Sequence, residues 1–195
     1  MILYHGTLES LVPEILRTGL QPRGERPSHD AYMDSASMPP FLYLTSSFGI
    51  AVQHAVRISE RVHQGAPISV FEIDTKVLKL ALRYPDEDYL REEWNSDFTD
   101  WTLKEQLAYM EHHQDEWRES LKMMKVIAYK GVIKPSLLRL APVPRWMEDG
   151  YRKRLPRKVN SRPYEENHQA YGAALGHHRG TLHTCAGEKD EGENR

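Results

Sequence analysis

The side chains best suited to chemistry begin very close to the start of the chain. The stretch "LYHGTLES" sets the imidazole of His5 in an apolar run and follows it with Gly6 and Thr7. A histidine in such a place can hydrogen-bond either the backbone beside it or a bound ligand. Near the other end, "GHHRGTLHTC" carries imidazole and thiol groups that can bind zinc, between residues 177 and 185. This spacing matches no common zinc module, so we predict no metal site.

Two stretches in the middle of the chain carry further candidates. "FLYLTSSFGIAVQHA" places Tyr43 in an apolar run and His54 on the apolar face of a predicted helix. "ESLKMMKVIAYKGVI" holds Glu119, Ser120 and Lys125 ahead of another apolar run. Taken singly, each has an ordinary structural explanation, because such a tyrosine or histidine is often packed in a core and such a lysine often faces solvent. These residues therefore indicate a function only as a set, through the order of their motifs along the chain.

The composition is that of a soluble protein able to build a core. The chain has 195 residues, of which 39% are hydrophobic and 28% charged, and its formal net charge is −2. Cys185 is the only cysteine, so the chain cannot form an internal disulfide, which favours a reducing compartment. No signal peptide is evident, and no apolar run approaches the ~20 residues of a membrane helix. We therefore expect a cytoplasmic protein without membrane contact.

Apolar residues are distributed unevenly along the chain. Residues 1–145 carry the periodic apolar patterns and are expected to form one catalytic domain. Residues 146–195 bury too little apolar surface to order themselves, and we expect a disordered tail. Within this tail, residues 151–162 include six basic side chains and no acidic one. Such a run can contact nucleic-acid phosphates, although it is more often simply solvated.

The spacing of apolar residues, together with glycine, proline and capping residues, predicts alternating strands and helices in the first domain. We expect strands in "MILYH", "FLYLT", "ISVFEID", "KVIAYKGVI" and "LLRLAP". A helix should end at Gly19, a second should begin with a serine cap before "FGIAVQHA", and a third should cover residues 102–124. We expect residues 21–40 to form a long loop. The acidic and aromatic stretch at residues 84–101 is interpreted as an insertion over the sheet.

Three of these stretches, in this order, resemble the ADP-ribosyltransferase superfamily, in the branch of diphtheria toxin and the poly(ADP-ribose) polymerases. They are "YHGT" followed by "IL..GL.PR", then "FLYLTSSFGIAVQHA", then "SLKMMKVIAYKGVIKPSLL". The resemblance covers roughly residues 3–140. It implies an α+β fold with a split, strongly bent antiparallel sheet, flanking helices, and a cleft lined by His5 and Tyr43. It also implies NAD as co-substrate.

The resemblance assigns roles in NAD binding to several residues. His5 would bond the adenosine-side ribose, and the backbone of Gly6 would meet the carboxamide, an approach that a Cβ would block. Tyr43 would stack on the nicotinamide ring, and His54 stands where many relatives have a second stacking aromatic. The remaining residues that match the cofactor-binding motifs are Thr7 and Ser120.

The third stretch departs from the family at its catalytic acid. In the register set by Ser120 and Tyr129, the glutamate of the family is replaced by Lys125, whose charge opposes the chemistry of an oxocarbenium. Either the register differs and Glu119 or Glu116 is the acid, or the acid comes from elsewhere. Otherwise the protein transfers single ADP-ribose units without that glutamate, or it is inactive.

These observations predict a mono-ADP-ribosyltransferase whose acceptor, a protein or a nucleic acid, is not named by the sequence. Two alternatives stay open. RNA 2′-phosphotransferases share the fold and the co-substrate and also open with His-Gly-Thr, but they carry a preceding lobe, and only four residues precede His5 here. A degenerate module of the same fold that binds a nucleotide or a partner is the non-enzymatic alternative, and Lys125 is its main support.

Overall fold

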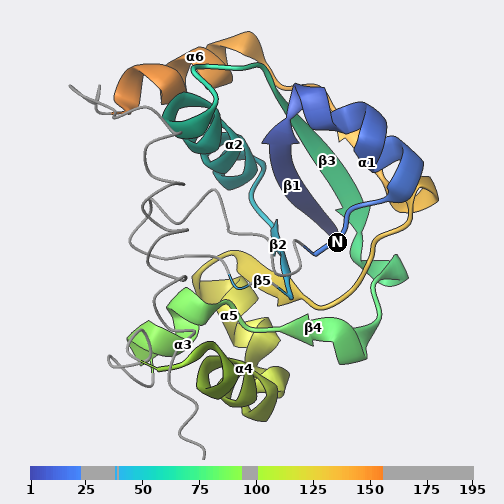
Figure 1. The fold of residues 1–195 in the computed structure, drawn as a ribbon, viewed down its shortest axis with the longest axis vertical. Helices are drawn as coiled ribbons and strands as arrows, with labels where there is room; N and C mark the ends of the chain where they lie inside the picture. Colours follow the sequence, from blue (N-terminus) through green and yellow to red (C-terminus); the bar gives the residue numbers. More distant parts are fainter. Residues whose placement is uncertain (23–37, 39, 94–100, 156–195) are drawn as a thin grey trace, which may run out of the picture. The chain divides into compact units, whose positions relative to one another are not determined.

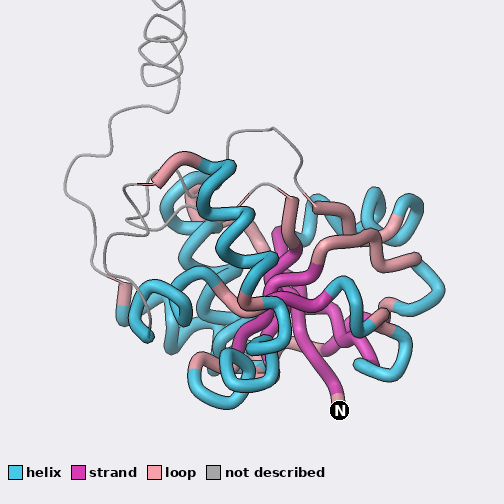
Figure 2. The backbone as a smooth tube through the Cα atoms, turned by 90° about the horizontal axis from the view of Figure 1, so that it is seen from below, coloured by secondary structure: helices cyan, strands magenta, loops and turns pink. Residues whose placement is uncertain are grey.

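One antiparallel sheet of six strands organises this computed structural model, which describes residues 1–22, 38, 40–93 and 101–155 (Figure 1). The strand order across the sheet is β4-β5-β2-β1-β3-β6. The strands are β1 (Ile2–Leu8), β2 (Leu42–Thr45), β3 (Ile68–Asp74), β4 (Arg83–Tyr84), β5 (Val126–Tyr129) and β6 (Arg139–Ala141). Figure 2 shows the strands running through the middle, with helices on either side. The expected mixed α/β architecture with an antiparallel sheet is confirmed.

Six α-helices flank the sheet in the described part of the chain. They are α1 (Val12–Thr18), α2 (Phe48–Val62), α3 (Glu87–Glu93), α4 (Leu103–His112), α5 (Trp117–Met123) and α6 (Arg145–Arg154). Short 3₁₀ turns at Glu9–Leu11, Thr75–Val77, Leu80–Leu82, Gln114–Glu116 and Pro135–Leu137 complete the connections. Within these residues, no helix combines the length and the apolar character needed to cross a membrane.

Local signals in the sequence set several element boundaries as expected. Gly19 ends α1 with a φ of 88°, a left-handed conformation that glycine adopts without a Cβ penalty. The hydroxyl of Ser47 accepts the N–H of Ile50 and caps α2. Strand β3 is paired on both sides, with β1 and with β6, as its apolar run predicts.

Three expectations require correction. The single helix over residues 102–124 is two helices, α4 and α5, separated by a 3₁₀ turn. Arg83 and Tyr84 form an edge strand, so the acidic segment begins within the sheet rather than over it. The stretch expected to be a disordered tail from residue 146 begins with an ordered segment, because Arg145–Arg154 form helix α6. The rest of the expected tail, including 156–162 of the basic run, lies outside the described residues.

Helix α2 packs very closely on β1 because small residues meet at the contact. A Cβ built on Gly6 would lie 2.1 Å from the carbonyl oxygen of Ala51 and 3.0 Å from the Cβ of Ala55. Neither Ala51 nor Ala55 projects more than a methyl group, and both are buried. The helix backbone therefore rests directly on the strand, and Gly6 is needed for packing whatever else it does.

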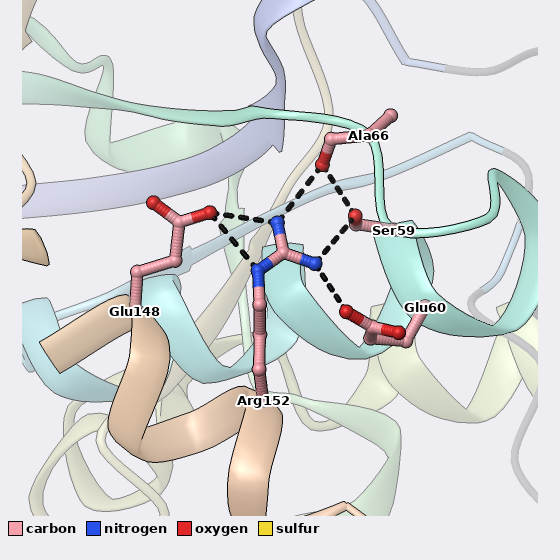
Figure 3. Close-up of polar contacts among 5 residues, drawn as sticks. All are labelled: Ser59, Glu60, Ala66, Glu148 and Arg152. Atoms are coloured by element: carbon pink, nitrogen blue, oxygen red, sulfur yellow. Dashed lines mark hydrogen bonds and ion pairs between the residues drawn. The ribbon is translucent and has the colours of Figure 1, made fainter. Parts of the chain in front are cut away.

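Arg152 links α6 to α2 through several hydrogen bonds and an ion pair. The guanidinium of Arg152 donates to Glu148 on its own helix, and also to Glu60 and the Ser59 hydroxyl on α2 (Figure 3). It also donates to the carbonyl oxygen of Ala66, just after α2, over 3.0 Å. The Arg152 side chain is only 20% exposed, so these bonds are shielded from water and worth more than surface ion pairs.

The contact between β1 and α2 gives the first testable prediction. Gly6→Ala should lower the free energy of unfolding by about 1–3 kcal/mol, the usual cost of overpacking a filled core site. The matched control is Gly150→Ala, because Gly150 lies on α6 and a Cβ added there would have no atom within 4 Å. That change should be neutral, or stabilising by up to about 1 kcal/mol through helix propensity. Urea unfolding of both variants measures the difference, and equal stabilities would contradict the close contact.

Candidate functional site

Strands β1 and β2 are joined by very little backbone pairing. Their register contains one pair, Tyr4 with Thr45, whereas β1 pairs with β3 along its whole length. Beyond that pair, the imidazole of His5 lies 3.0 Å from the carbonyl oxygen of Tyr43, measured from its Nδ1. Because a carbonyl oxygen can only accept, Nδ1 must carry the proton, and in the neutral ring Nε2 is an acceptor. A side chain thus connects the two strands where the ladder stops.

The residues that follow His5 face different neighbours. Gly6 lies against the backbone of Ala51 on α2, and the registered pairing of β1 with β2 does not extend to it. Thr7 is partly buried and pairs with Ser69 of β3. His54 lies on α2 one turn beyond Ala51 and is also partly buried. The structure therefore brings the first stretch and the start of α2 together at one end of β1.

Tyr43 is held by its hydroxyl as well as by its main chain. The phenol oxygen accepts the backbone N–H of Met38 over 2.9 Å. Burial raises the pKa of Tyr43 well above its usual value, and the charge of Glu87 and a hydrogen bond to that carboxyl raise it further. The ring packs on a cluster of buried residues, which are Met38, Phe41, Tyr84, Tyr89, Leu90, Met110 and Ala128.

Glu87, at the start of α3, has an unusual environment. Burial raises the pKa of its carboxyl well above the usual value, and the neighbouring charge of Asp86 acts in the same direction. The hydrogen bond to Tyr43 opposes this shift without cancelling it. Its Oε2 atom is buried and has no hydrogen-bond partner among the described residues. A carboxyl that keeps its proton to higher pH can act as an acid, or it can ionise when a cation arrives.

Ser120 positions this acidic segment. Its hydroxyl accepts the backbone N–H of Asp86 and donates to the carbonyl oxygen of Val126, both over 2.9 Å. The carboxylate of Asp86 in turn accepts the N–H of Asp88 and caps α3. Ser120 is completely buried. It therefore links the end of α5 and the start of β5 to the segment that carries Glu87.

The two candidate catalytic residues of the third stretch are exposed and engaged elsewhere. The carboxylate of Glu119 lies 3.4 Å from the ammonium of Lys122, in a pair that is open to solvent. Lys125 follows the end of α5 with a left-handed φ of 64°, and its ammonium donates to the carbonyl of Lys122 over 2.7 Å. Within the described residues, neither charged group bonds to Tyr43 or Ser120. Glu116 instead pairs with His113 over 2.7 Å.

Sequence reasoning missed Glu87 and Asp86 as members of the site. Both fall in the stretch interpreted as an insertion, because a run of acidic residues usually marks a solvated segment. A short, mostly apolar run, "LALRY", ends two residues before Asp86 and could have indicated that the segment leaves the sheet edge. Their burial, however, depends on packing against Tyr43 and Ser120, which lie far away in the sequence.

Comparison of this chain with protein-family models, with curated proteins and with solved structures finds no match. Within the described residues, no group of three or more His, Cys, Asp or Glu side chains could hold a metal ion. The zinc-competent stretch at residues 177–185 lies outside those residues. The site therefore has to be interpreted from its own geometry.

The raised pKa of Glu87 predicts how stability varies with pH. Between the unfolded pKa of about 4.3 and the higher folded value, the folded state binds more protons, so the free energy of unfolding falls as pH rises. Glu87→Gln keeps a neutral side chain that can still accept from Tyr43. As pH rises above the unfolded pKa, its stability should fall less than that of the wild type, with slopes differing by up to about 1.4 kcal/mol per pH unit.

The control for this measurement is Glu105→Gln. Bonds to Thr102 lower the pKa of Glu105, so it titrates below this range. Urea unfolding should give the Glu105→Gln variant the same pH slope as the wild type. If Glu87→Gln also shares that slope, Glu87 titrates normally and the site lacks a perturbed acid.

Proposed function

We propose that this protein is an NAD-dependent mono-ADP-ribosyltransferase. The strand order supports this, because β5, β2 and β1 are neighbours and carry or adjoin the three stretches that resemble the ADP-ribosyltransferase superfamily. The observation that carries the proposal is the 3.0 Å contact between the His5 imidazole and the Tyr43 carbonyl. It joins the His5 side chain to the main chain of Tyr43, not to its ring, at the place where β1 and β2 stop pairing.

In this proposal NAD binds at the junction of β1 and β2. The Nε2 atom of His5 bonds the adenosine-side ribose while Nδ1 is occupied by the Tyr43 carbonyl. The main chain of Gly6, not paired with β2, meets the carboxamide, and Thr7 completes the motif. Tyr43 and His54 contact the nicotinamide ring from β2 and from α2. Fixing the co-substrate in one conformation supplies a large part of the catalysis.

Glu87 takes the place of the acid that the third stretch lacks. It reaches Tyr43 from α3, and Ser120 holds its segment in position. Ser120 is therefore a positioning residue in this scheme rather than one that touches NAD. Glu119 and Lys125 face solvent and bond to Lys122, so this scheme assigns neither of them a part in the chemistry.

The charge on NAD makes Glu87 suitable for this role. The nicotinamide ring of NAD is cationic, and a cation nearby favours the ionised carboxyl and lowers its pKa. When the bond between C1′ and the ring nitrogen breaks, the electron pair leaves with nicotinamide and C1′ becomes an oxocarbenium. The carboxylate then stabilises this positive charge until the acceptor attacks C1′ and releases its proton to solvent.

A second candidate, a nucleotide-binding module without transferase activity, has one specific observation in its favour. The residue in the position of the family acid is Lys125, and its side chain turns back onto Lys122 at the end of α5. A protein that lost its acid there and gained none elsewhere would still bind NAD at β1 and β2. The two candidates therefore differ in turnover, not in binding.

Release of free nicotinamide from NAD tests the proposal. The wild type should release it, and Glu87→Gln should slow release at least about ten-fold, or ~1.4 kcal/mol in the barrier, because the carboxylate charge is lost. Glu119→Gln is the matched control, since it removes the same charge from an exposed position, and its rate should equal that of the wild type.

Three other results would count against the assignment. Binding of NAD by calorimetry without nicotinamide release supports the non-enzymatic module. Loss of activity in Glu119→Gln, with none in Glu87→Gln, returns the acid to the third stretch. A gain of ten-fold or more in Lys125→Glu, on the scale of ~1.4 kcal/mol per decade, shows that the family register holds and that Glu87 is not the acid.

A further inference from the structure

A cavity of about 430 Å³ lies between α2 and α6, and positive charge lines it. Its walls are formed by two helical rows of side chains, one from each helix. The lining residues are Gln53, Arg57, Arg61, Tyr151, Arg154 and Leu155. On α2 these residues are spaced by four, and Arg154 and Leu155, at the end of α6 and just after it, follow Tyr151 by three and four, so each row lies along one side of its helix.

Among the described residues, no carboxylate forms an ion pair with the arginines that line this cavity. Arg57 and Arg61 are four residues apart on α2, a spacing at which like charges repel. The Nε atom of Arg57 is buried and has no hydrogen-bond partner in the described part of the chain. Arg61 and Arg154 are exposed at the rim, and neither forms an ion pair with any described residue.

Two carboxylates of these helices are bound to Arg152, and the other acidic residue of α6, Asp149, is exposed and pairs with no cavity arginine in the described part of the chain. Glu60 is the one carboxylate on α2, and it is bound by Arg152 (Figure 3). Glu148 on α6 is bound by the same guanidinium over 2.7 Å. The network of Arg152 with these two carboxylates carries a net charge of −1, so the three arginines that line the cavity still leave an excess of positive charge there. The buried Nε–H of Arg57 also requires an acceptor.

We propose that this cavity between α2 and α6 is a binding site for a phosphate monoester. Guanidinium groups bind phosphate oxygens with paired N–H donors, and a dianion removes the repulsion between Arg57 and Arg61. A single phosphate fills only part of a cavity of this size, which is in the range of small-molecule sites. The remaining space, beside Tyr151 and Leu155, suits the organic group that carries the phosphate. This site is separate from the proposed NAD site and does not depend on it.

The test measures binding to the full chain at constant ionic strength, with inorganic phosphate and phenyl phosphate as probes and calorimetry as readout. The wild type should bind one phosphate per chain, and phenyl phosphate more tightly if the organic group contributes. Arg57→Gln should weaken binding at least ten-fold. Arg145→Gln is the matched control, because Arg145 is an exposed arginine of α6 outside the cavity, and its affinity should equal that of the wild type.

Thermal unfolding in phosphate-free buffer accompanies the binding test. Arg57→Gln should melt no lower than the wild type there, since one of two repelling charges on α2 has been removed. If that variant does not fold, Arg154→Gln, at the exposed rim, provides the same comparison and should weaken binding several-fold. Absence of binding to the wild type, equal losses in Arg57→Gln and Arg145→Gln, or benzoate binding as tightly as phenyl phosphate would overturn the proposal.

Discussion

The hydrogen bond from the His5 imidazole to the Tyr43 carbonyl sets the geometry of the junction between β1 and β2. One backbone pair and this hydrogen bond join the β1-β3-β6 part of the sheet to the β2-β5-β4 part directly, and a buried core shared by β1, β3, β2 and β5 packs the two parts together. A side chain can span a wider gap than a ladder of amides can, so the strands are able to separate beyond Tyr4. Separated strands expose main-chain groups that need a partner, which is the condition for binding a ligand between them.

The packing at Gly6 on β1 also determines where helix α2, and with it helix α6, lies on the sheet. Gly6 lets the backbone of α2 rest on the strand, and Arg152 then fastens α6 to α2. The position of His54 and the shape of the arginine-lined cavity both follow from this packing, since both lie on α2. A larger residue at Gly6 would therefore disturb the proposed NAD site and the proposed phosphate site together, whereas changes at Arg57 should affect only the second.

Much of the fold was predictable because its signals are local. The Ser47 cap, the Gly19 stop and the apolar run of β3 each identify an element within a few residues. Helix α6 was missed because the chain beyond residue 145 has few apolar residues. The four-residue spacing of Met147 and Tyr151 on α6 and Leu155 just after it nevertheless matches the side that packs on the core shared with α2. The burial and raised pKa of Glu87 could not be predicted, because they arise from contacts with residues far away in the sequence.

Nuclear magnetic resonance of the His5 ring and the Gly6 amide tests the central claim most directly. In the free protein, the ring nitrogens should show the tautomer with the proton on Nδ1, because the Tyr43 carbonyl accepts it. Addition of NAD should then shift Nε2 of His5 and the amide of Gly6 together, at the same NAD concentration. The opposite tautomer in the free protein, or NAD-induced shifts that leave both groups unchanged, would contradict a nucleotide site at the junction of β1 and β2.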